Sequence, residues 1–385
     1  MSFLLAILWV IFAALLCWQL LRWLPAGADK YNPLPYIIAL IPLATYVVGA
    51  LFFVSLGANL WNYFYAPKLA QSYNFAQSYA YLCIAYAVLF LISIKSYAPY
   101  WFGRLRKLRK EQQQTPEKIR VMTLNCRYGK ASAAQIIETA KKYNVNTLLL
   151  QELSESLVKN LKKLGIYEIF PTSCVGAQSA HNNGGFNAIF TKYSAISTCN
   201  NSVKIEAASV PSITTRLDFD APANVFVKFA SVHPKSPMRG CKAWSEGIRA
   251  LANLIDSAET YEAHATYESA ETYEISKTTE TAKNSQSSEL ATLTILTGDL
   301  NSAIDHPSFR TLIKAGFADS AISLGHRLRT WPTWLKWPNL TLDHVLFCAK
   351  NLHAKAVWHK NVEIDGTDHL AYIAEIALYP IHSMD

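Results

Sequence analysis

The sequence has few charged residues, glycines and prolines for its length. Of its 385 residues 17% are charged, below the roughly 25% usual in soluble domains, and there are only 15 Gly and 16 Pro. This composition excludes disordered, collagen-like and coiled-coil chains. Because 51% of the residues are hydrophobic, we expect a folded protein of which one part lies outside water.

Metal-binding cysteine motifs are also missing. The seven cysteines include no C-x-x-C pair and no Cys/His cluster at zinc spacing. A structural zinc site and a disulfide framework are therefore not expected.

The C-terminal part of the chain lacks a surplus of basic residues. Residues 1–113 contain nine Lys or Arg and two acids and so carry +7 of the net charge of +8, which leaves residues 114–385 nearly neutral. Proteins that bind nucleic acid tightly gather basic residues on the binding face. The high isoelectric point of the whole chain is therefore no sign of such a face.

Three long apolar runs account for the missing charge. They cover residues 3–21, 34–56 and 76–94, and Trp and Tyr residues flank them. At 1.5 Å per residue such helices cross a hydrocarbon core of about 30 Å, and aromatic rings favour its two interfaces. We predict a three-helix transmembrane region over 1–95. The alternatives are a cleaved signal peptide for the first run, which lacks a basic n-region, and a buried core helix for the third.

A basic segment follows the third run. We interpret residues 96–117 as a juxtamembrane linker whose cluster at 104–110 contacts anionic lipid headgroups or is simply solvated. Most Lys and Arg residues of the N-terminal region lie on the same side of the three spans as the C-terminal domain. The positive-inside rule thus predicts a multi-pass protein of a bacterial-type plasma membrane with this domain in the cytoplasm.

Beyond residue 117 the pattern changes to short β-rich runs alternating with amphipathic helical stretches. This predicts an α/β domain over 118–385. Residues 257–289, where ETYE occurs twice and aliphatic residues are scarce, are predicted to form a disordered insertion.

Polar side chains follow several of the predicted strands. They are Asn125, Gln151, Glu152, His233, Asp299, Asn301, Asp343 and His344, and a further group before the last strand, Asp365, Asp368 and His369. Each one alone could be a turn or helix-capping residue. As a set at converging strand ends, with oxygen ligands predominating over sulfur, they indicate a site for Mg²⁺ or Mn²⁺ and for phosphate chemistry.

The motifs resemble those of the endonuclease/exonuclease/phosphatase superfamily. The matching stretches occur in the family's order: TLNCRYG (123–129), LLLQEL (148–153), GGFNAIFTKY (184–193), SVHPKSP (231–237), TGDLNSAIDHPSFR (297–310), TWPTW with TLDHVLF (330–347) and GTDHLAYIAEI (366–376). The resemblance implies a four-layer αββα sandwich, which is two packed sheets with helices on both outer faces.

By position, the resemblance also implies roles for single residues. Asn125, Glu152 and Asp368 would be metal or metal-adjacent ligands, with Mg²⁺ or Mn²⁺ as the cofactor. The catalytic residues would be His233, Asp299, Asn301, Asp343 and His369, with Asp343 orienting His369. The chain departs from the family pattern at two positions, where Arg127 replaces an acid of several nucleases and Thr367 replaces the more frequent Ser.

The function that this implies is that of a membrane-anchored, metal-dependent phosphoesterase. Its substrate would be nucleic acid, a phospholipid or a small phosphodiester, and its other partner the lipid bilayer; no protein partner can be inferred. The alternative is a non-catalytic membrane protein that binds phosphate esters or lipid through a family-like domain.

Overall fold

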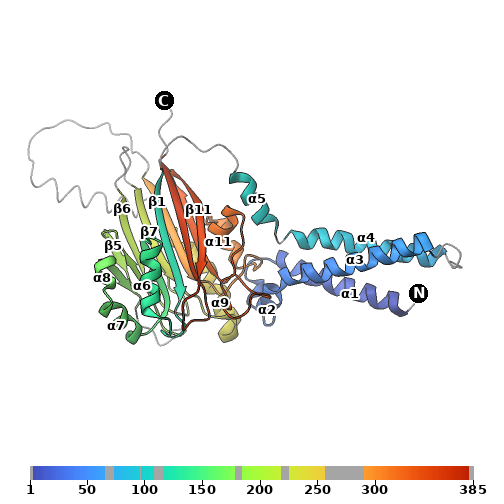
Figure 1. Cartoon of the computed structure of the whole chain (residues 1–385), viewed down its shortest axis with the longest axis horizontal. Helices are drawn as coiled ribbons and strands as arrows, with labels where there is room; N and C mark the ends of the chain where they lie inside the picture. The colour runs from blue at the N-terminus through green and yellow to red at the C-terminus, as the bar shows by residue number, and fades with distance from the viewer. Residues whose placement is uncertain are drawn as a thin grey trace, which may run out of the picture.

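A computed structural model of the chain describes residues 3–65, 73–95, 97–107, 116–177, 184–217, 225–255 and 290–380. Long helices project from one side of a domain built around two β-sheets (Figure 1). The predicted insertion at 257–289 lies outside the described residues.

The two sheets contain all the strands of the described residues, six in each. The first sheet has the order β11-β12-β1-β2-β4-β3, with β1 at Glu117–Asn125, β2 at Thr147–Leu153, β3 at Thr172–Val175, β4 at Phe186–Thr191, β11 at Leu352–Val362 and β12 at Ala371–Pro380. The second has the order β5-β6-β7-β8-β10-β9, with β5 at Ser197–Cys199, β6 at Ser212–Leu217, β7 at Val225–Val232, β8 at Ala291–Asp299, β9 at Ala318–Asp319 and β10 at Asp343–Lys350.

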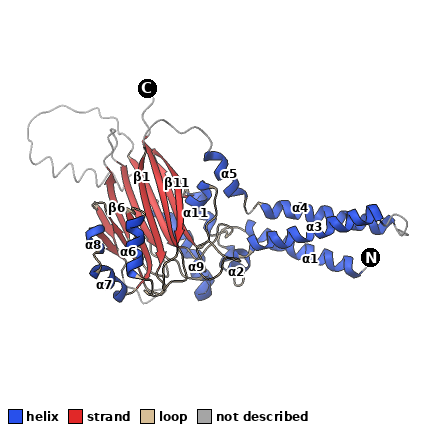
Figure 2. Ribbon diagram, in the orientation of Figure 1, coloured by secondary structure: helices blue, strands red, loops and turns tan. Residues whose placement is uncertain are grey.

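Helices cover the outer face of each sheet (Figure 2). The first sheet carries α6 (Ala133–Lys142), α7 (Glu155–Lys163) and α8 (Ile166–Ile169), and the second carries α9 (Pro237–Ala250), η3 (Leu251–Leu254) and α11 (Phe309–Ala315). The predicted four-layer αββα sandwich is therefore confirmed.

The central strands are apolar on both faces because each sheet is buried on both sides. In β1, Ile119 and Val121 point into the core between the sheets, whereas Met122 and Leu124 pack under the helices of the first sheet. This is the two-residue alternation of a strand.

Strand direction brings polar residues of both sheets to one edge of the sandwich. β1 runs parallel to β2, and β7 runs parallel to β8, so within each pair the carboxyl ends of the strands lie at the same edge of the sheet. The hydrogen bond from Asn125 to Asp299 shows that the two sheets share this edge. β10 runs antiparallel to β8 and begins with Asp343 directly opposite Asp299. The loop before β12 reaches the same edge, because the Thr367 hydroxyl donates to the Asn125 carbonyl at 2.7 Å.

The N-terminal region holds three helices long and apolar enough to cross a membrane, over Phe3–Trp23, Ile41–Trp61 and Gln77–Ile94. They belong to α1 (Phe3–Leu20, continued by η1 at Leu21–Trp23), α3 (Ile41–Tyr65) and α4 (Tyr73–Ile94). The second predicted span begins differently in the structure, since its first residues form a separate short helix, α2 (Leu34–Ala39). Pro42 explains the break, because a proline removes a helical hydrogen bond and restricts the residue before it.

The segment between α1 and α3, which includes η2 (Ala28–Lys30), packs against the domain instead of lying free. Arg22 pairs with Asp305 at 3.3 Å, and both side chains are buried. An Arg310 guanidinium nitrogen donates to the Leu24 carbonyl at 3.1 Å, and Nε2 of His306 lies 2.9 Å from the Pro35 carbonyl. The apolar helices are thus joined to the domain by buried polar contacts.

The predicted linker 96–117 also contains structure. Its first part is helix α5 (Ala98–Lys107), which packs against α12 (Ser320–Leu324) of the domain. Residues 108–115, with part of the basic cluster, lie outside the described residues.

Candidate active site

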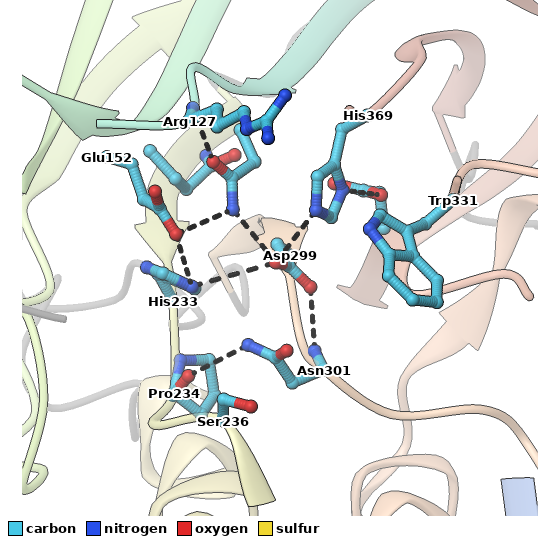
Figure 3. A network of polar contacts seen from close by, with 12 residues as sticks. Arg127, Glu152, His233, Pro234, Ser236, Asp299, Asn301, Trp331 and His369 are labelled. Carbon is cyan, nitrogen blue, oxygen red and sulfur yellow. Dashed lines mark hydrogen bonds and ion pairs between the residues drawn. The ribbon is translucent and has the colours of Figure 1, made fainter. Parts of the chain in front are cut away.

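Asp299 lies at the centre of the site, at the end of β8. Its Oδ2 accepts a hydrogen bond from the Asn125 amide at 3.0 Å and lies 3.6 Å from Nε2 of His233 and 3.7 Å from Nε2 of His369. Its Oδ1 accepts from the backbone amide of Asn301 at 2.8 Å. Figure 3 shows Glu152, His233, Asn301 and His369 around Asp299. A buried carboxylate thus faces two imidazole nitrogens.

Glu152 is the second carboxylate of the site. Its Oε1 accepts from the Asn125 amide at 3.1 Å and lies 3.7 Å from Nε2 of His233, while its Oε2 accepts from the Tyr128 backbone amide at 2.9 Å. The Glu152 backbone is left-handed, with φ of 51°, which is strained for a residue with a side chain. Strain of this kind is typical of functional sites.

Two glycines leave room for that carboxylate. A Cβ atom at Gly184 would lie 2.6 Å from the Glu152 carboxyl carbon, and one at Gly185 would lie 2.3 Å from the Leu153 carbonyl oxygen. Both glycines also have positive φ, of 101° and 152°. The GG pair of the 184–193 motif therefore allows a loop to pass close beside Glu152.

His369 and Asp343 form a buried hydrogen-bonded pair. Nδ1 of His369 lies 2.9 Å from Oδ2 of Asp343, so Nε2 is the nitrogen that faces Asp299. Burial alone would lower the pKa of His369, but the charges of Asp343 and Asp299 outweigh it and raise this pKa to about 10. Burial raises the pKa of the Asp343 carboxyl, against the opposing effect of the His369 charge. The pair therefore holds a protonated imidazole in the site at neutral pH.

Asp368 lies beside this pair and faces a different set of neighbours. Its Oδ1 is 3.6 Å from Nε of Arg127, and its Oδ2 accepts from the Trp331 indole at 3.3 Å. Arg127 also donates its backbone amide to Oδ1 of Asn125 at 2.9 Å. Asp368 and Glu152 thus lie on either side of Asn125 and Arg127.

His233 and Asn301 complete the second sheet's contribution. The His233 side chain is only 1% exposed, and within the described residues its Nδ1 has no hydrogen-bond partner. The Asn301 amide donates to the Pro234 carbonyl at 3.3 Å, and the Trp244 indole donates to the Asn301 carbonyl at 3.0 Å. These contacts tie the loops after β7 and β8 to each other and to α9.

Three of the polar residues noted at the strand ends have structural partners elsewhere. Gln151 lies between the sheets and donates to Ser231 at 2.9 Å. His344 points to the other face of β10 from Asp343 and contacts Asp319 at 2.7 Å. Asp365 accepts from the Gln135 side chain at 2.7 Å. The structure brings together the eight residues assigned to the site by resemblance, namely Asn125, Glu152, His233, Asp299, Asn301, Asp343, Asp368 and His369.

The donor set fits a hard divalent cation. Carboxylate oxygens of Glu152, Asp299 and Asp368 face this edge of the sandwich, and such oxygen ligands are preferred by Mg²⁺ and Mn²⁺. Asn125 lies among them, with its amide nitrogen toward Glu152 and Asp299 and its Oδ1 toward the Arg127 backbone amide. Asp299, Asp343 and His369 also offer atoms within 4.8 Å of one another. Since Asp343 already occupies Nδ1 of His369, we interpret this second group as a histidine–carboxylate pair facing Asp299.

Trp331 and Arg127 contact the site but have no role in the predicted set. Trp331 is the first tryptophan of the TWPTW motif. The contact of its indole with Asp368 could be found only in the three-dimensional structure. Arg127 was noted as a departure from the family pattern, and the structure shows that its side chain faces Asp368. It supplies a positive charge at a position where several nucleases carry an acid.

A two-sheet α/β sandwich whose strand ends gather carboxylates, amides and histidines defines a phosphoesterase-type fold. Residues 122–369 match the model of the Endonuclease/Exonuclease/phosphatase family, and the chain belongs to this family. The resemblance seen in the motifs is thereby confirmed. Enzymes of the family hydrolyse phosphoester bonds and generally depend on a divalent metal ion.

Solved structures resemble the chain over the same domain. One is a D. rerio TDP2 humanized by 14 mutations, with 15% identity and a TM-score of 0.46, covering 67% of this chain and 98% of its own. An endonuclease/exonuclease/phosphatase from Beutenbergia cavernae has 14% identity and a TM-score of 0.45 and covers 68% of this chain and 72% of its own. Sphingomyelinase C from Streptomyces griseocarneus has 13% identity and a TM-score of 0.39, with coverages of 67% and 99%. No curated protein matches the chain.

Proposed function

We propose that the protein is a membrane-anchored, Mg²⁺- or Mn²⁺-dependent hydrolase of phosphodiester bonds. The observation that carries this proposal is the placement of Asp299 between two histidines, with Nε2 of His233 at 3.6 Å and Nε2 of His369 at 3.7 Å from its Oδ2. A proton acceptor flanked by two donors suits the attack of water on a phosphate with negative oxygens.

Each residue of the site has a task in this reaction. Asp299 accepts the proton of the attacking water, and the Asn301 side chain helps to hold that water near the phosphorus. His369, kept protonated by Asp343, donates to one non-bridging oxygen, and His233 donates to another. These donors stabilise the charge that the phosphate gains during in-line displacement.

Glu152 and Asp368 would hold the metal ion through their carboxylate oxygens, with Asn125 adjacent to it. When bound there, the ion neutralises phosphate and leaving-group charge as a Lewis acid. The Tyr128 backbone amide and the Asn125 side chain both donate to Glu152 and so orient its carboxylate. Arg127 faces Asp368 and sets its orientation on the other side.

The charge distribution favours a lipid or a small phosphodiester over duplex nucleic acid. Residues 114–385 are nearly neutral, whereas each phosphate contact with a duplex normally requires a Lys or Arg. The apolar helices, joined to the domain by the buried Arg22–Asp305 pair, would keep the site near a bilayer. A phosphodiester in or beside the membrane is therefore the substrate class that we favour.

A substrate panel tests the proposal. Purified full-length protein is assayed on supercoiled DNA, single-stranded RNA, sphingomyelin, phosphatidylinositol phosphates and bis(p-nitrophenyl) phosphate, each with Mg²⁺, with Mn²⁺ and with EDTA. We expect metal-dependent turnover of a lipid or of the small diester that EDTA abolishes. Cleavage of DNA alone would contradict the favoured substrate class, and binding without turnover in every assay would indicate the non-catalytic alternative.

A further inference from the structure

A polar cavity of about 330 Å³ lies between the apolar helices and the domain, and it is lined by other residues than those of the active site. Leu43 and Tyr46 of α3 and Tyr97, just after α4, line it on the helical side. Arg327 and Arg329 line it on the domain side. This volume is in the range of small-molecule binding sites, about 300–1,000 Å³.

The cavity lies at the domain end of two candidate spans. Leu43 and Tyr46 belong to the first two turns of α3, whose span begins at Ile41, and Tyr97 follows the span that ends at Ile94. With both helices across a bilayer, Leu43 and Tyr46 lie within the outer two helical turns of the hydrocarbon core, and Tyr97 lies just beyond it, next to the lipid headgroups.

The rim of the cavity is aromatic. Trp337 of the domain packs edge-to-face on Tyr46 of α3, with ring centroids 5.8 Å apart. Trp337 is 60% exposed, although it is a large apolar side chain. Exposed tryptophans beside the end of an apolar helix are typical of the membrane interface, where their rings are both apolar and polar.

Two guanidinium groups supply the charge of the cavity. Nη1 of Arg329 donates to the Thr333 and Leu335 carbonyls, and Arg327 donates through Nε to the Thr341 hydroxyl and through Nη2 to the Asn339 carbonyl. Within the described residues, these contacts leave Nε and Nη2 of Arg329 and Nη1 of Arg327 without a protein partner.

Among the described residues that line the cavity there is no carboxylate. Asp305 is the acid near Arg327, whose charge opposes the effect of burial that raises the pKa of Asp305. This carboxylate is already paired with Arg22 at 3.3 Å. The two arginines are therefore left with unmatched positive charge and with donors available to an anion.

We propose that this cavity binds the phosphate group of an anionic phospholipid from the surrounding bilayer. The arginine donors bind the phosphate oxygens, and the acyl chains run along α3 below Leu43 and Tyr46. A phosphate carries the charge and the acceptor geometry that guanidinium groups bind best, and the negative potential of an anionic membrane surface attracts nearby arginines. The inference rests on the membrane placement within the proposed function and is independent of catalysis.

Native mass spectrometry of the full-length protein in detergent tests this site. Phosphatidylglycerol, phosphatidylcholine with the same acyl chains, and inorganic phosphate are titrated separately, all with EDTA so that hydrolysis does not interfere. The variants are Arg329→Gln, Leu43→Trp, which fills the cavity without touching the arginines, and His369→Ala in the active site. Arg216→Gln on the distant strand β6 is the matched control, and a melting curve for each variant reports folding.

We expect the protein to retain phosphatidylglycerol at least tenfold more strongly than phosphatidylcholine. Arg329→Gln and Leu43→Trp should each weaken this retention about tenfold, while His369→Ala and Arg216→Gln leave it unchanged. Equal retention of both lipids, or loss of retention in His369→Ala alone, would overturn the proposal. Inorganic phosphate that binds as tightly as the lipid would show a site for free phosphate instead. A catalytically inactive protein that still retains the lipid would contradict the proposed function but not this site.

Discussion

The carboxylate of Asp29, in the segment between the first two long helices, is bound at both oxygens by Ser308 of the catalytic domain. Oδ2 accepts from the Ser308 backbone amide at 2.9 Å, and Oδ1 accepts from the Ser308 hydroxyl at 2.5 Å. Ser245 of α9 donates a third, longer bond of 3.5 Å to Oδ1. Asp29 is fully buried, so these contacts hold the segment between α1 and α3 firmly against the domain.

The first prediction concerns this contact. Asp29→Ala removes the acceptor and leaves a buried amide unsatisfied, at a cost of about 1–3 kcal/mol per orphaned group. We expect the melting temperature of the full chain in detergent to fall by several degrees. Glu138→Ala, on the exposed face of α6, is the control and should change it little. An unchanged melting curve for Asp29→Ala would show that this contact does not couple the segment between α1 and α3 to the domain.

Much of the site could be predicted from sequence because strand alternation and strand ends leave a local signal. The apolar strands ending in Asn125, Glu152 and Asp299 mark one edge of a sandwich. Consecutive residues on a strand face opposite sides, so only one of Asp343 and His344 can reach the site. Which of the two does so depends on the pairing of Asp343 with Asp299, which is a long-range property.

The Asp29–Ser308 contact had no such signal. The two residues are 279 positions apart in the chain: Asp29 lies in the short helix η2, and Ser308 lies in the turn before α11. The division of the second apolar run at Pro42 has a local cause, whereas the packing of the segment before it on α9 depends on tertiary structure. Buried polar contacts between distant loops therefore remain beyond single-sequence inference.

The second prediction concerns Glu152 as a metal ligand. Glu152→Gln keeps the shape of the side chain and removes its charge, so the metal should bind more weakly and turnover should fall about 100-fold or more at limiting Mg²⁺. Folding should be preserved, because an amide oxygen can still accept from Tyr128. Activity is measured as a function of Mg²⁺ concentration, with Glu117→Gln at the exposed start of β1 as the control. Full activity at low Mg²⁺ would exclude Glu152 as a ligand.

The third prediction follows from the hydrogen bond between Asp343 and His369. Residues that act as one unit lose activity non-additively. We expect Asp343→Asn and His369→Ala each to lower kcat/KM by about 10²–10⁴, and the double variant to lose little more. The exposed His353→Ala is the matched control. Losses that add in the logarithm of the rate would show that the two residues act separately.

The fourth prediction is a pH dependence of stability from His344 and Asp319. Burial lowers the pKa of His344, but the hydrogen bond and the charge of Asp319 at 2.7 Å outweigh it, so the net pKa is raised. A raised folded-state pKa gives stability that is complete below the unfolded value of about 6.5 and is lost as pH rises through the folded value. We therefore expect the protein to lose stability as the pH increases above neutrality.

Asp319→Asn isolates this effect. Asparagine can still accept from the Ile322 amide and so keeps the N-cap of α12, but it removes the charge that faces His344. The variant should melt lower than the wild type near pH 6, and the difference should shrink toward pH 9. Melting curves at several pH values in one detergent provide the measurement. A constant difference across the series would mean that the His344 charge does not contribute.

The last prediction is the side of the membrane on which the domain lies. The segment before α3 and Tyr97 after α4 both lie against the domain, as three spans require, which leaves the start of α1, the end of α3 and the start of α4 on the opposite side. Of the nine Lys and Arg residues in 1–113, only Lys68 lies on that opposite side. The positive-inside rule then predicts a cytoplasmic domain. We expect green fluorescent protein fused after Asp385 of the full chain to be fluorescent and alkaline phosphatase at the same position to be inactive, with the reverse pattern for reporters inserted at Lys68. Active phosphatase after Asp385 would mean that the domain faces the outside.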